Sequence, residues 1–138
     1  MANMTDYAEQ KTAERLARGT ADAIPATWYL ALFTSAPSDV GGGTEVSGMG
    51  YARVAAPRNE ATFGVATSVG GVMTSASLVD LAFPGSLGAW GTVTHYAWFD
   101  AATNGNMWFH GTLPIARVVD DAGITIKMPV GSVSIGVD

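Results

Sequence analysis

The sequence predicts a mainly β protein: a single antiparallel β-sandwich or jelly-roll-like barrel with one N-terminal α-helix. Short runs rich in β-branched and aromatic residues recur after Pro25, and turns of Gly, Pro, Asn and Asp separate them. No segment with helical periodicity lies between these runs, which argues against parallel βαβ units. We therefore expect an N-terminal helical arm over residues 1–22 and a β-sandwich domain over residues 23–138.

The N-terminal helix is predicted over residues 5–18. Thr5 or the aspartate after it can cap the first turn, and Gly19 stands where a left-handed C-cap glycine is typical. The apolar stripe of this helix is thin, with Tyr7 and Leu16 as its large members. A helix with so little apolar surface gains little from packing. We expect it to lean on the β domain or on a neighbouring subunit, and to serve assembly.

The strands are expected in a regular series. The apolar run 28–33 ends before Pro37, and the run 51–56 ends before Pro57, because proline has no N–H to donate within a sheet. The other expected strands are 63–67, 72–77, 78–83, 92–100, 106–113, 117–119, 124–128 and 133–137.

Two turns are predicted to form hairpins. Asn104-Gly105 is a strong hairpin signal between 92–100 and 106–113, and Asp120 to Gly123 are expected to join 117–119 to 124–128. Alternation along the strand 92–100 assigns one face to Thr92, Thr94, Tyr96 and Trp98, and the other to Val93, His95, Ala97 and Phe99. Neither face is plainly polar, which predicts a strand covered on both sides or a sheet that meets another subunit.

Composition narrows the possible functions. The chain has 138 residues, a formal net charge of −5, and only 14% charged residues, against about 25% in an ordinary soluble domain. So little charge predicts that a partner covers part of the surface. The acidic balance argues against nucleic acid, and no apolar run is long enough for a membrane helix. The absence of cysteine excludes a disulfide framework and thiolate chemistry.

The glycine-rich segment 37–50 resembles no phosphate site, because Glu45 stands where a P-loop requires a lysine. An exposed loop on a rigid β domain is a usual contact element. Asp39 and Glu45 could hold a cation, but two acids six residues apart are a weak signal.

No catalytic or metal-binding set is predicted. His95 and His110 could approach each other across the Asn104-Gly105 hairpin, but Asp100 is the only nearby acid. Two histidines without a further ligand do not complete a zinc site. No Gly-x-Ser-x-Gly elbow is present. We expect no enzyme activity, no metal and no cofactor.

Two blocks of sequence resemble a family of small virion structural proteins of tailed bacteriophages. The first is LFTSAPSDVGGGTEVSGMGYAR (32–53), and the second combines WGTVTH (90–95) with FDAATNGNM (99–107). DYAE (6–9) opens the helix as in that family. The resemblance implies a protein of the virion that contacts the major capsid or tail proteins. We also expect a homo-oligomer, and the resemblance supplies no catalytic residues. The charge and the lack of a long apolar run predict that the protein binds neither nucleic acid nor membrane.

Three functions follow from this resemblance. The favoured one is capsid decoration, as a cement protein, because the chain is a small single domain without a fibrous segment and with little charge. The alternatives are a tail- or neck-associated minor structural protein, or a receptor- or glycan-binding module at the tail, for which an aromatic sheet face could stack on sugars. The candidate assembly contacts are Tyr7, Leu16, Asp39, Gly41, Gly42, Gly43, Glu45, Tyr51 and Arg53.

Overall fold

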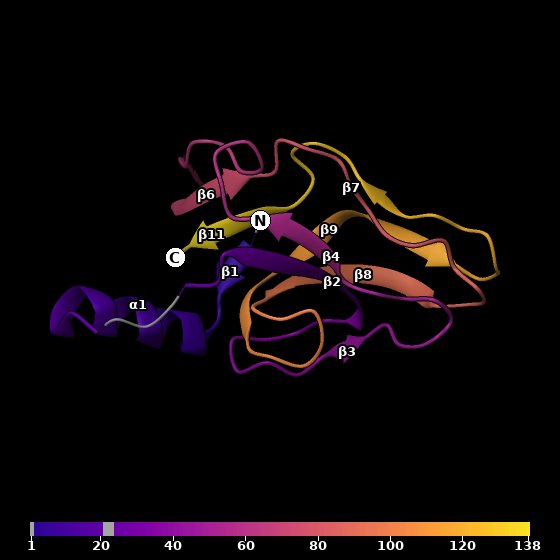
Figure 1. Ribbon diagram of the computed structural model, residues 1–138, viewed down its shortest axis with the longest axis horizontal. Helices are drawn as coiled ribbons and strands as arrows, with labels where there is room; N and C mark the ends of the chain where they lie inside the picture. Colours follow the sequence, from indigo (N-terminus) through magenta and orange to yellow (C-terminus); the bar gives the residue numbers. More distant parts are fainter. Residues whose placement is uncertain (1, 21–23) are drawn as a thin grey trace.

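The computed structural model describes residues 2–20 and 24–138. Figure 1 shows strands arranged in layers, with one helix at one end of the molecule. The elements are β1 (Ala2–Met4), α1 (Asp6–Arg18), β2 (Thr27–Ser35), β3 (Thr44–Glu45), β4 (Val54–Pro57), β5 (Thr67–Val69), β6 (Val72–Ala76), β7 (Leu81–Ala82), β8 (Gly91–Phe99), β9 (Met107–Val119), β10 (Lys127–Met128) and β11 (Ser134–Val137). The predicted mainly β fold with one helix is confirmed, as a sandwich and not as a closed barrel.

The main sheet has the order β1-β9-β8-β2, and β3 and β4 both pair with the outer edge of β2. Two smaller sheets, β11-β6-β5 and β10-β7, complete the sandwich. All of these pairings are antiparallel. The long central strands β2, β8 and β9 therefore form a rigid support for the loops at their ends.

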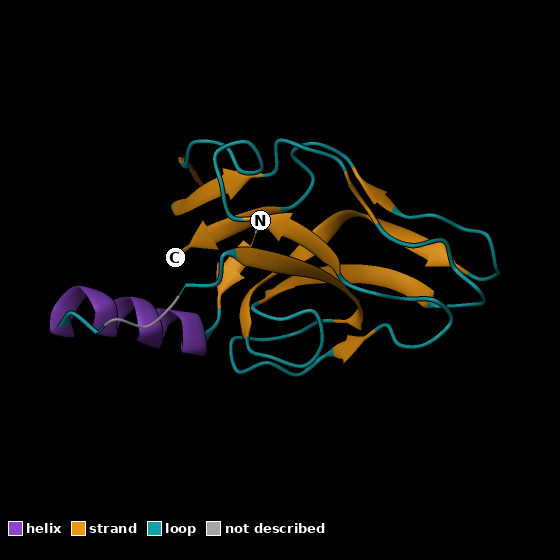
Figure 2. Ribbon diagram, viewed as in Figure 1, coloured by secondary structure: helices purple, strands orange, loops and turns teal. Residues whose placement is uncertain are grey.

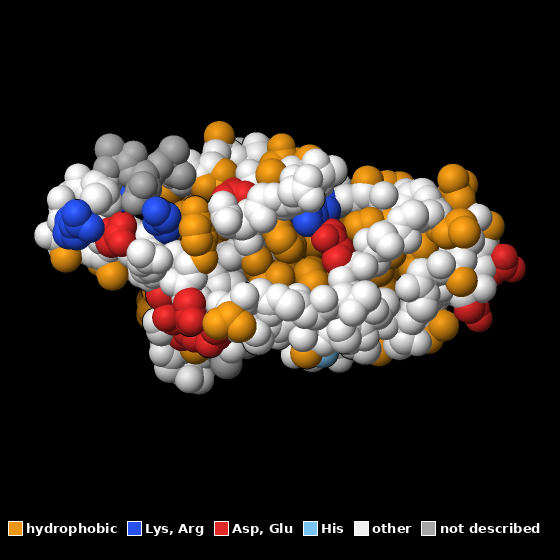
Figure 3. Space-filling view, turned by 90° about the horizontal axis from the view of Figure 1, so that it is seen from below, with side chains coloured by type: hydrophobic (Ala, Val, Ile, Leu, Met, Phe, Trp, Pro, Cys, Tyr) orange, Lys and Arg blue, Asp and Glu red, His pale blue; other side chains and the backbone are white. Residues whose placement is uncertain are grey.

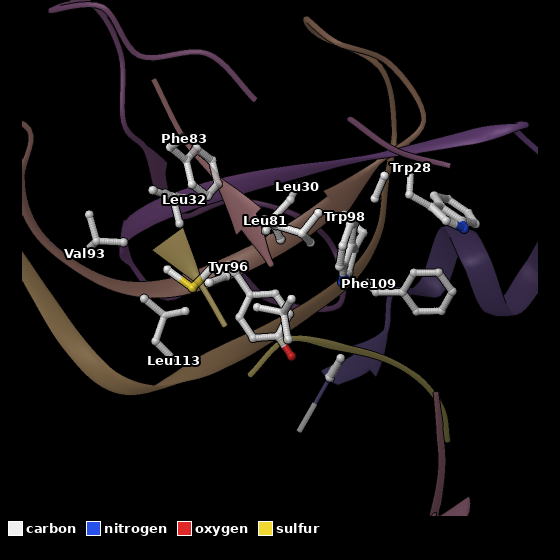
Figure 4. Packing of buried hydrophobic residues seen from close by; sticks show 14 of the residues in the cluster. Trp28, Leu30, Leu32, Leu81, Phe83, Val93, Tyr96, Trp98, Phe109 and Leu113 are labelled. Atoms are coloured by element: carbon white, nitrogen blue, oxygen red, sulfur yellow. The ribbon is translucent and has the colours of Figure 1, made fainter. Parts of the chain in front are cut away.

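The core lies between the main sheet and the smaller sheets. Trp98 and Tyr96 of β8 and Leu30 of β2 are almost fully buried, together with Met128 and Val133 from the facing layer. Figure 4 shows Trp98 and Tyr96 packed among Leu30, Leu32, Leu81 and Phe109. The Trp98 indole N–H donates to the backbone oxygen of Ser134 at 2.9 Å, so the largest core side chain also ties the two layers together.

The alternation predicted for strand 92–100 is wrong at Val93. The pairing register between β8 and β9 shifts between Val93 and His95, whose partners are Arg117 and Thr112. This irregularity turns Val93 to the same side as Tyr96, and both belong to the sandwich core. Ala97 and Phe99 lie on the opposite face, as predicted, and pack with Ala31 and Phe33.

The Asn104-Gly105 turn joins β8 to β9, as predicted, but the second predicted hairpin is wrong. β9 runs without interruption from Met107 to Val119, so it joins the two predicted strands 106–113 and 117–119, and β10 pairs with β7. Ser86 is the physical reason. Its hydroxyl donates to the oxygen of Asp121 and accepts from the N–H of Ile124, and its carbonyl accepts from Gly123. These bonds hold the turn against the segment after β7.

The predicted strand 63–67 does not form. Asn59 accepts hydrogen bonds from the N–H and the hydroxyl of Thr62, which holds this segment in a turn. Phe63 makes a single β-bridge, to Ser77. The strand β5 begins at Thr67, next to a Gly-Gly turn into β6.

The helix α1 forms where it is predicted, with Thr5 as its N-cap. The Thr5 hydroxyl accepts from the N–H of Ala8 at 3.2 Å and donates to the oxygen of Met107 at 2.7 Å. Gly19 ends the helix in the left-handed conformation, with φ of 64°. Ala8 is its buried residue, and Figure 2 shows the helix extending away from the strands. This helix is too short and too polar to cross a membrane.

The sequence pattern does not predict the strand β1. It pairs with β9, with Ala2 opposite Gly111 and Met4 opposite Phe109, and both β1 residues are buried. The Met4 N–H also donates to the Asp138 carboxylate at 3.1 Å. The chain division near residue 22 stays a prediction, and residues 2–4 of that predicted arm lie in the main sheet.

Close contact between β1 and β11 makes Gly136 sensitive to substitution. A Cβ at Gly136 would overlap the carbonyl oxygen of Ala2 and stand 2.9 Å from Cγ1 of Val72. Gly136→Ala is therefore expected to lower the free energy of unfolding by about 1–3 kcal/mol, the usual cost of overpacking. Urea denaturation measures this. Gly85→Ala is the control, because its Cβ meets one atom at 3.7 Å. Equal stability of the two variants would contradict the prediction.

Candidate functional site

A hollow with a volume of about 650 Å³ lies between the start of α1, the glycine loop (residues 36–43) and the turn between β8 and β9. We call it the glycine hollow. Figure 3 shows this face, with apolar side chains at the base and acidic and basic groups beside them. The lining residues are Thr5, Asp6, Tyr7, Gln10, Phe33, Asp39, Val40, Gly41, Gly42, Gly43, Glu45, Arg53, Phe99, Asn104, Gly105, Asn106 and Met107.

Two stacked aromatic rings form the floor. Phe33 of β2 and Phe99 of β8 have parallel rings with centroids 6.3 Å apart. They belong to a small cluster with Ala31 and Ala97, on the face of the main sheet opposite the sandwich core. Met107 packs at the edge of this cluster. The face of β8 that carries Ala97 and Phe99 is thus covered in part by the loops that surround the glycine hollow.

Arg53 joins the walls of the glycine hollow to its floor. Its guanidinium lies 3.7 Å from the centre of the Phe99 ring and pairs with Glu45 in a bidentate arrangement, at 2.8 and 2.9 Å. Nη1 also donates to the oxygens of Ala101 and Asn104, at 2.9 and 2.8 Å. The Arg53 side chain is only 7% exposed. One residue therefore holds β3 and the β8–β9 turn against the sheet.

Tyr51 binds the same Glu45 carboxylate that Arg53 holds. Its hydroxyl donates to Oε2 of Glu45 at 2.7 Å and accepts from the N–H of Leu32 at 3.0 Å. Burial, and next the hydrogen bond to Glu45, raise the pKa of Tyr51 well above its ordinary value. The phenol therefore stays protonated and keeps its role as a donor.

The glycine loop is held in place at Asp39. The oxygen of Asp39 accepts from the N–H of Asp6, and its carboxylate contacts Nε2 of His110 at 2.8 Å. Gly43 has φ of 74°, and a Cβ there would stand 2.8 Å from the nitrogen of Pro37. Only glycine fits this return to the sheet. At Gly41 no atom lies within 4 Å of a Cβ position, so the loop is open on its outer side.

The structure brings most of the candidate contact residues together. Seven of them line the glycine hollow: Tyr7, Asp39, Gly41, Gly42, Gly43, Glu45 and Arg53. Tyr51 lies beneath them through its bond to Glu45. Leu16 is separate, because it lies on the far half of α1 and is 81% exposed, beside a smaller cavity that Ile24 and Trp108 also line.

The sequence pattern does not predict the floor and one wall of the glycine hollow. The strand pattern gives Phe33 and Phe99 no role in a site, and it predicts Asn104 and Asn106 only as residues of a turn and the start of a strand. A usable signal exists, since all four belong to the blocks 32–53 and 99–107 that carry the family resemblance. The antiparallel pairing of β2, which holds Phe33, with β8, which ends at Phe99, brings these blocks onto neighbouring strands.

The two histidines lie on one face of the β8–β9 hairpin, in diagonal positions, since His95 is opposite Thr112 and His110 is opposite Ala97. His95 Nδ1 contacts the hydroxyl of Thr94 at 2.8 Å, and His110 contacts Asp39. Within residues 2–20 and 24–138, no group of three or more histidine and acidic side chains is placed to hold a metal ion. The metal content of the protein stays a prediction.

Asp100 organises the β8–β9 turn. Its carboxylate accepts from the backbone N–H of Asn106 at 2.8 Å, and from the Asn106 amide and the Trp108 indole, both at 3.2 Å. Burial acts to raise the pKa of Asp100, but these hydrogen bonds outweigh it and lower the pKa. The ionised form is therefore the one that the fold stabilises.

This lowered pKa predicts acid sensitivity. The stabilisation from Asp100 is present above the ordinary aspartate pKa of about 3.9, and it is lost as the pH falls through the lower pKa of the folded state. Asp100→Asn is expected to cost about 1 kcal/mol near neutral pH and to flatten the loss of stability below about pH 4. Chemical denaturation at several pH values measures this, with the exposed Asp120→Asn as control. An acid response that is the same in both variants would rule it out.

One comparison with known proteins identifies a family. The family model described as Gp80: Podophage GP4 fiber I protein gp80 matches residues 3–136 of the chain. No curated protein matches the sequence. The match spans α1, the strands β2 to β10 and every residue that lines the glycine hollow.

Proposed function

The chain belongs to the podophage GP4 fiber I protein gp80 family, and on that premise we propose that it is a tail-associated structural part of the virion that acts through protein–protein contacts. The protein is a virion protein. Its family supports the tail-associated alternative of the sequence analysis better than capsid decoration. The observation that carries the proposal is the extent of the match, which covers nearly the whole chain.

The arrangement of the glycine hollow supports a role in binding and not in catalysis. The paired charged groups of the glycine hollow have structural roles. Arg53 and Glu45 pair with each other, and Asp39 holds the glycine loop through its contact with His110. A site whose walls are fixed in this way loses little conformational entropy when a partner binds. We propose that the protein is not an enzyme and that the glycine hollow and the end of α1 are its contact surfaces.

Fractionated particles test the tail-associated role. Complete virions and tailless heads are purified, and the copy number of the protein in each is measured by quantitative mass spectrometry. We expect a small number of copies per complete virion and none on tailless heads. Hundreds of copies, retained on tailless heads, would instead establish capsid decoration and overturn the proposal.

The arm role of α1 is tested by a single substitution. Leu16 is 81% exposed, and Leu16→Glu is expected to leave the free energy of unfolding within about 0.5 kcal/mol. Incorporation of this variant into virions should fall, because a partner would have to bury the new charge. Val65→Glu is the control, at a residue that is 91% exposed in another part of the chain. Normal incorporation of both variants would show that the end of α1 makes no contact.

A further inference from the structure

We propose that the protein associates head to tail with a second copy of itself, with Leu87 of one copy in a cavity beside α1 of the next. The inference deepens the proposed function, because it names the partner of the contact surface at the end of α1. Figure 1 shows α1 at one end of the molecule and the loop after β9 at the other. We call this second end the loop tip, and it consists of residues 46–50, 84–90 and 120–124.

The loop tip exposes two large apolar side chains. Met49 is 57% exposed and Leu87 is 73% exposed. Their loops are neighbours, since the N–H of Leu87 donates to the backbone oxygen of Met49 at 2.9 Å. Glycines allow the close approach: a Cβ at Gly50 would stand 2.9 Å from Cγ of Leu87, and a Cβ at Gly88 would stand 2.8 Å from Sδ of Met49. The two side chains therefore form one apolar surface.

The backbone at Met49 supports a contact role for its side chain. Its φ is 49°, in the left-handed region that strains a residue with a Cβ. The glycines on either side have φ of 70° and 79°, so a third glycine would fit there without strain. The indole N–H of Trp90 donates to the Met49 oxygen at 2.9 Å and holds this conformation. Backbone strain of this kind gathers at functional sites, and here it presents an exposed methionine.

Two carboxylates flank the apolar surface. Asp120 and Asp121 are both exposed. The hydroxyl of Ser86 donates to the backbone oxygen of Asp121 at 2.7 Å, which fixes this turn beside the segment that carries Leu87. The loop tip contains these two acids and no lysine or arginine. It is therefore an apolar surface with a negative border.

The far half of α1 offers a cavity that suits such a surface. Its volume is about 120 Å³. An apolar cavity of about 150 Å³ holds a benzene molecule, so this cavity has room for the smaller side chain of one leucine. The residues that line it are Lys11, Thr12, Arg15, Leu16, Ile24 and Trp108.

The charges of the two ends are complementary. Residues 11–18 contain three cations, Lys11, Arg15 and Arg18, against one carboxylate, Glu14. Arg15 and Arg18 are exposed in the last turn of α1. The positive end of one copy therefore attracts the negative loop tip of the next, whereas two loop tips or two α1 ends repel each other. A contact between unlike ends is heterologous, so copies add in a row.

Sedimentation equilibrium of the full chain tests the association, from about 1 μM to about 1 mM, a range that detects a Kd between these limits. We expect the average mass to rise with protein concentration. The association should weaken as the ionic strength rises from about 0.1 M to about 0.5 M, because salt screens the charges of the two ends. A native chain that stays monomeric over the whole range would overturn the proposal.

Substitutions in the loop tip locate the contact. Leu87→Gln is expected to weaken association about tenfold or more, because the cavity no longer receives an apolar side chain. Val65→Gln is the matched control, at a residue that is 91% exposed outside the loop tip. Met49→Asn should also weaken association without lowering the urea midpoint, because asparagine tolerates a positive φ. Equal association by Leu87→Gln and Val65→Gln would contradict the proposal.

A mixing experiment tests whether the two ends bind each other. Leu16→Glu blocks the end of α1, and Leu87→Gln blocks the loop tip, so each variant alone should stay monomeric. An equimolar mixture should form a complex of two chains, because the intact loop tip of one variant meets the intact α1 end of the other. Dimers of either variant alone, or no complex in the mixture, would overturn the proposal. None of these results changes the copy number in complete virions, so the tail-associated role is judged separately.

Discussion

Replacing Arg53 by alanine is expected to lower the free energy of unfolding by about 3 kcal/mol, at the lower end of the cost of breaking a buried ion pair. The guanidinium is 7% exposed and the Glu45 side chain 24% exposed, so the remaining carboxylate would be largely buried without its partner. The variant also loses two bonds to the β8–β9 turn and the contact with Phe99. Thermal and urea unfolding measure the loss.

Two comparisons separate the causes of this loss. Arg53→Lys keeps the charge but cannot reproduce the bidentate pair and the two carbonyl bonds, so it should recover only part of the stability. Arg58→Ala removes an exposed arginine that donates to the oxygen of Pro25, and we expect it to cost less than about 1 kcal/mol. If Arg53→Ala is as stable as Arg58→Ala, then Arg53 does not hold the walls of the glycine hollow together.

The second large effect is expected at the centre of the sandwich. Trp98 is fully buried, packs edge-on against Phe63 with ring centroids 5.5 Å apart, and donates to Ser134 in the facing layer. Trp98→Ala should destabilise the protein by about 3–5 kcal/mol, because a large cavity forms and the oxygen of Ser134 loses a donor. Urea denaturation followed by far-UV circular dichroism measures this.

The variant Trp98→Phe refines this prediction. It keeps an aromatic ring in the core but removes the indole N–H, and we expect a loss between those of the native chain and Trp98→Ala. A cost below about 1 kcal/mol for Trp98→Ala would mean that the core collapses around the gap, which would contradict the close packing seen around Trp98 in Figure 4.

Local signals account for the parts of the fold that could be predicted. Thr5 and Gly19 mark the two ends of the helix. The N-cap bond from Ala8 to Thr5 and the left-handed turn at Gly19 depend only on residues near them in the sequence. The Asn104-Gly105 hairpin is local in the same way. By contrast, the turn at 120–123 is held by Ser86, far away in the sequence, so its own residues carry no sign of the true partner.

The candidate site shows the same division. The glycine loop could be singled out by its run of glycines, and Arg53 by its place in the block 32–53 that carries the family resemblance. The floor could not be assigned, because the contact between Phe33 and Phe99 depends on the register between β2 and β8. The register shift between Val93 and His95 also turns Val93 into the sandwich core, whereas simple alternation assigns it to the opposite face. Leu16 is a candidate contact by its chemistry alone, and the fold keeps it apart from the others.

The strand β1 gives the molecule an asymmetric response to mechanical load. The strand β1 lies beside the C-terminal end of the chain, since the Met4 N–H donates to the Asp138 carboxylate. A force that pulls the two ends apart would act first on β1 and β11, where three and four residues pair with the rest of the fold. The long pairings of β2, β8 and β9 would bear little of that tension, whereas Thr5, Asp6 and Tyr7 follow β1 directly, so this wall of the glycine hollow would be the first to feel the separation of β1.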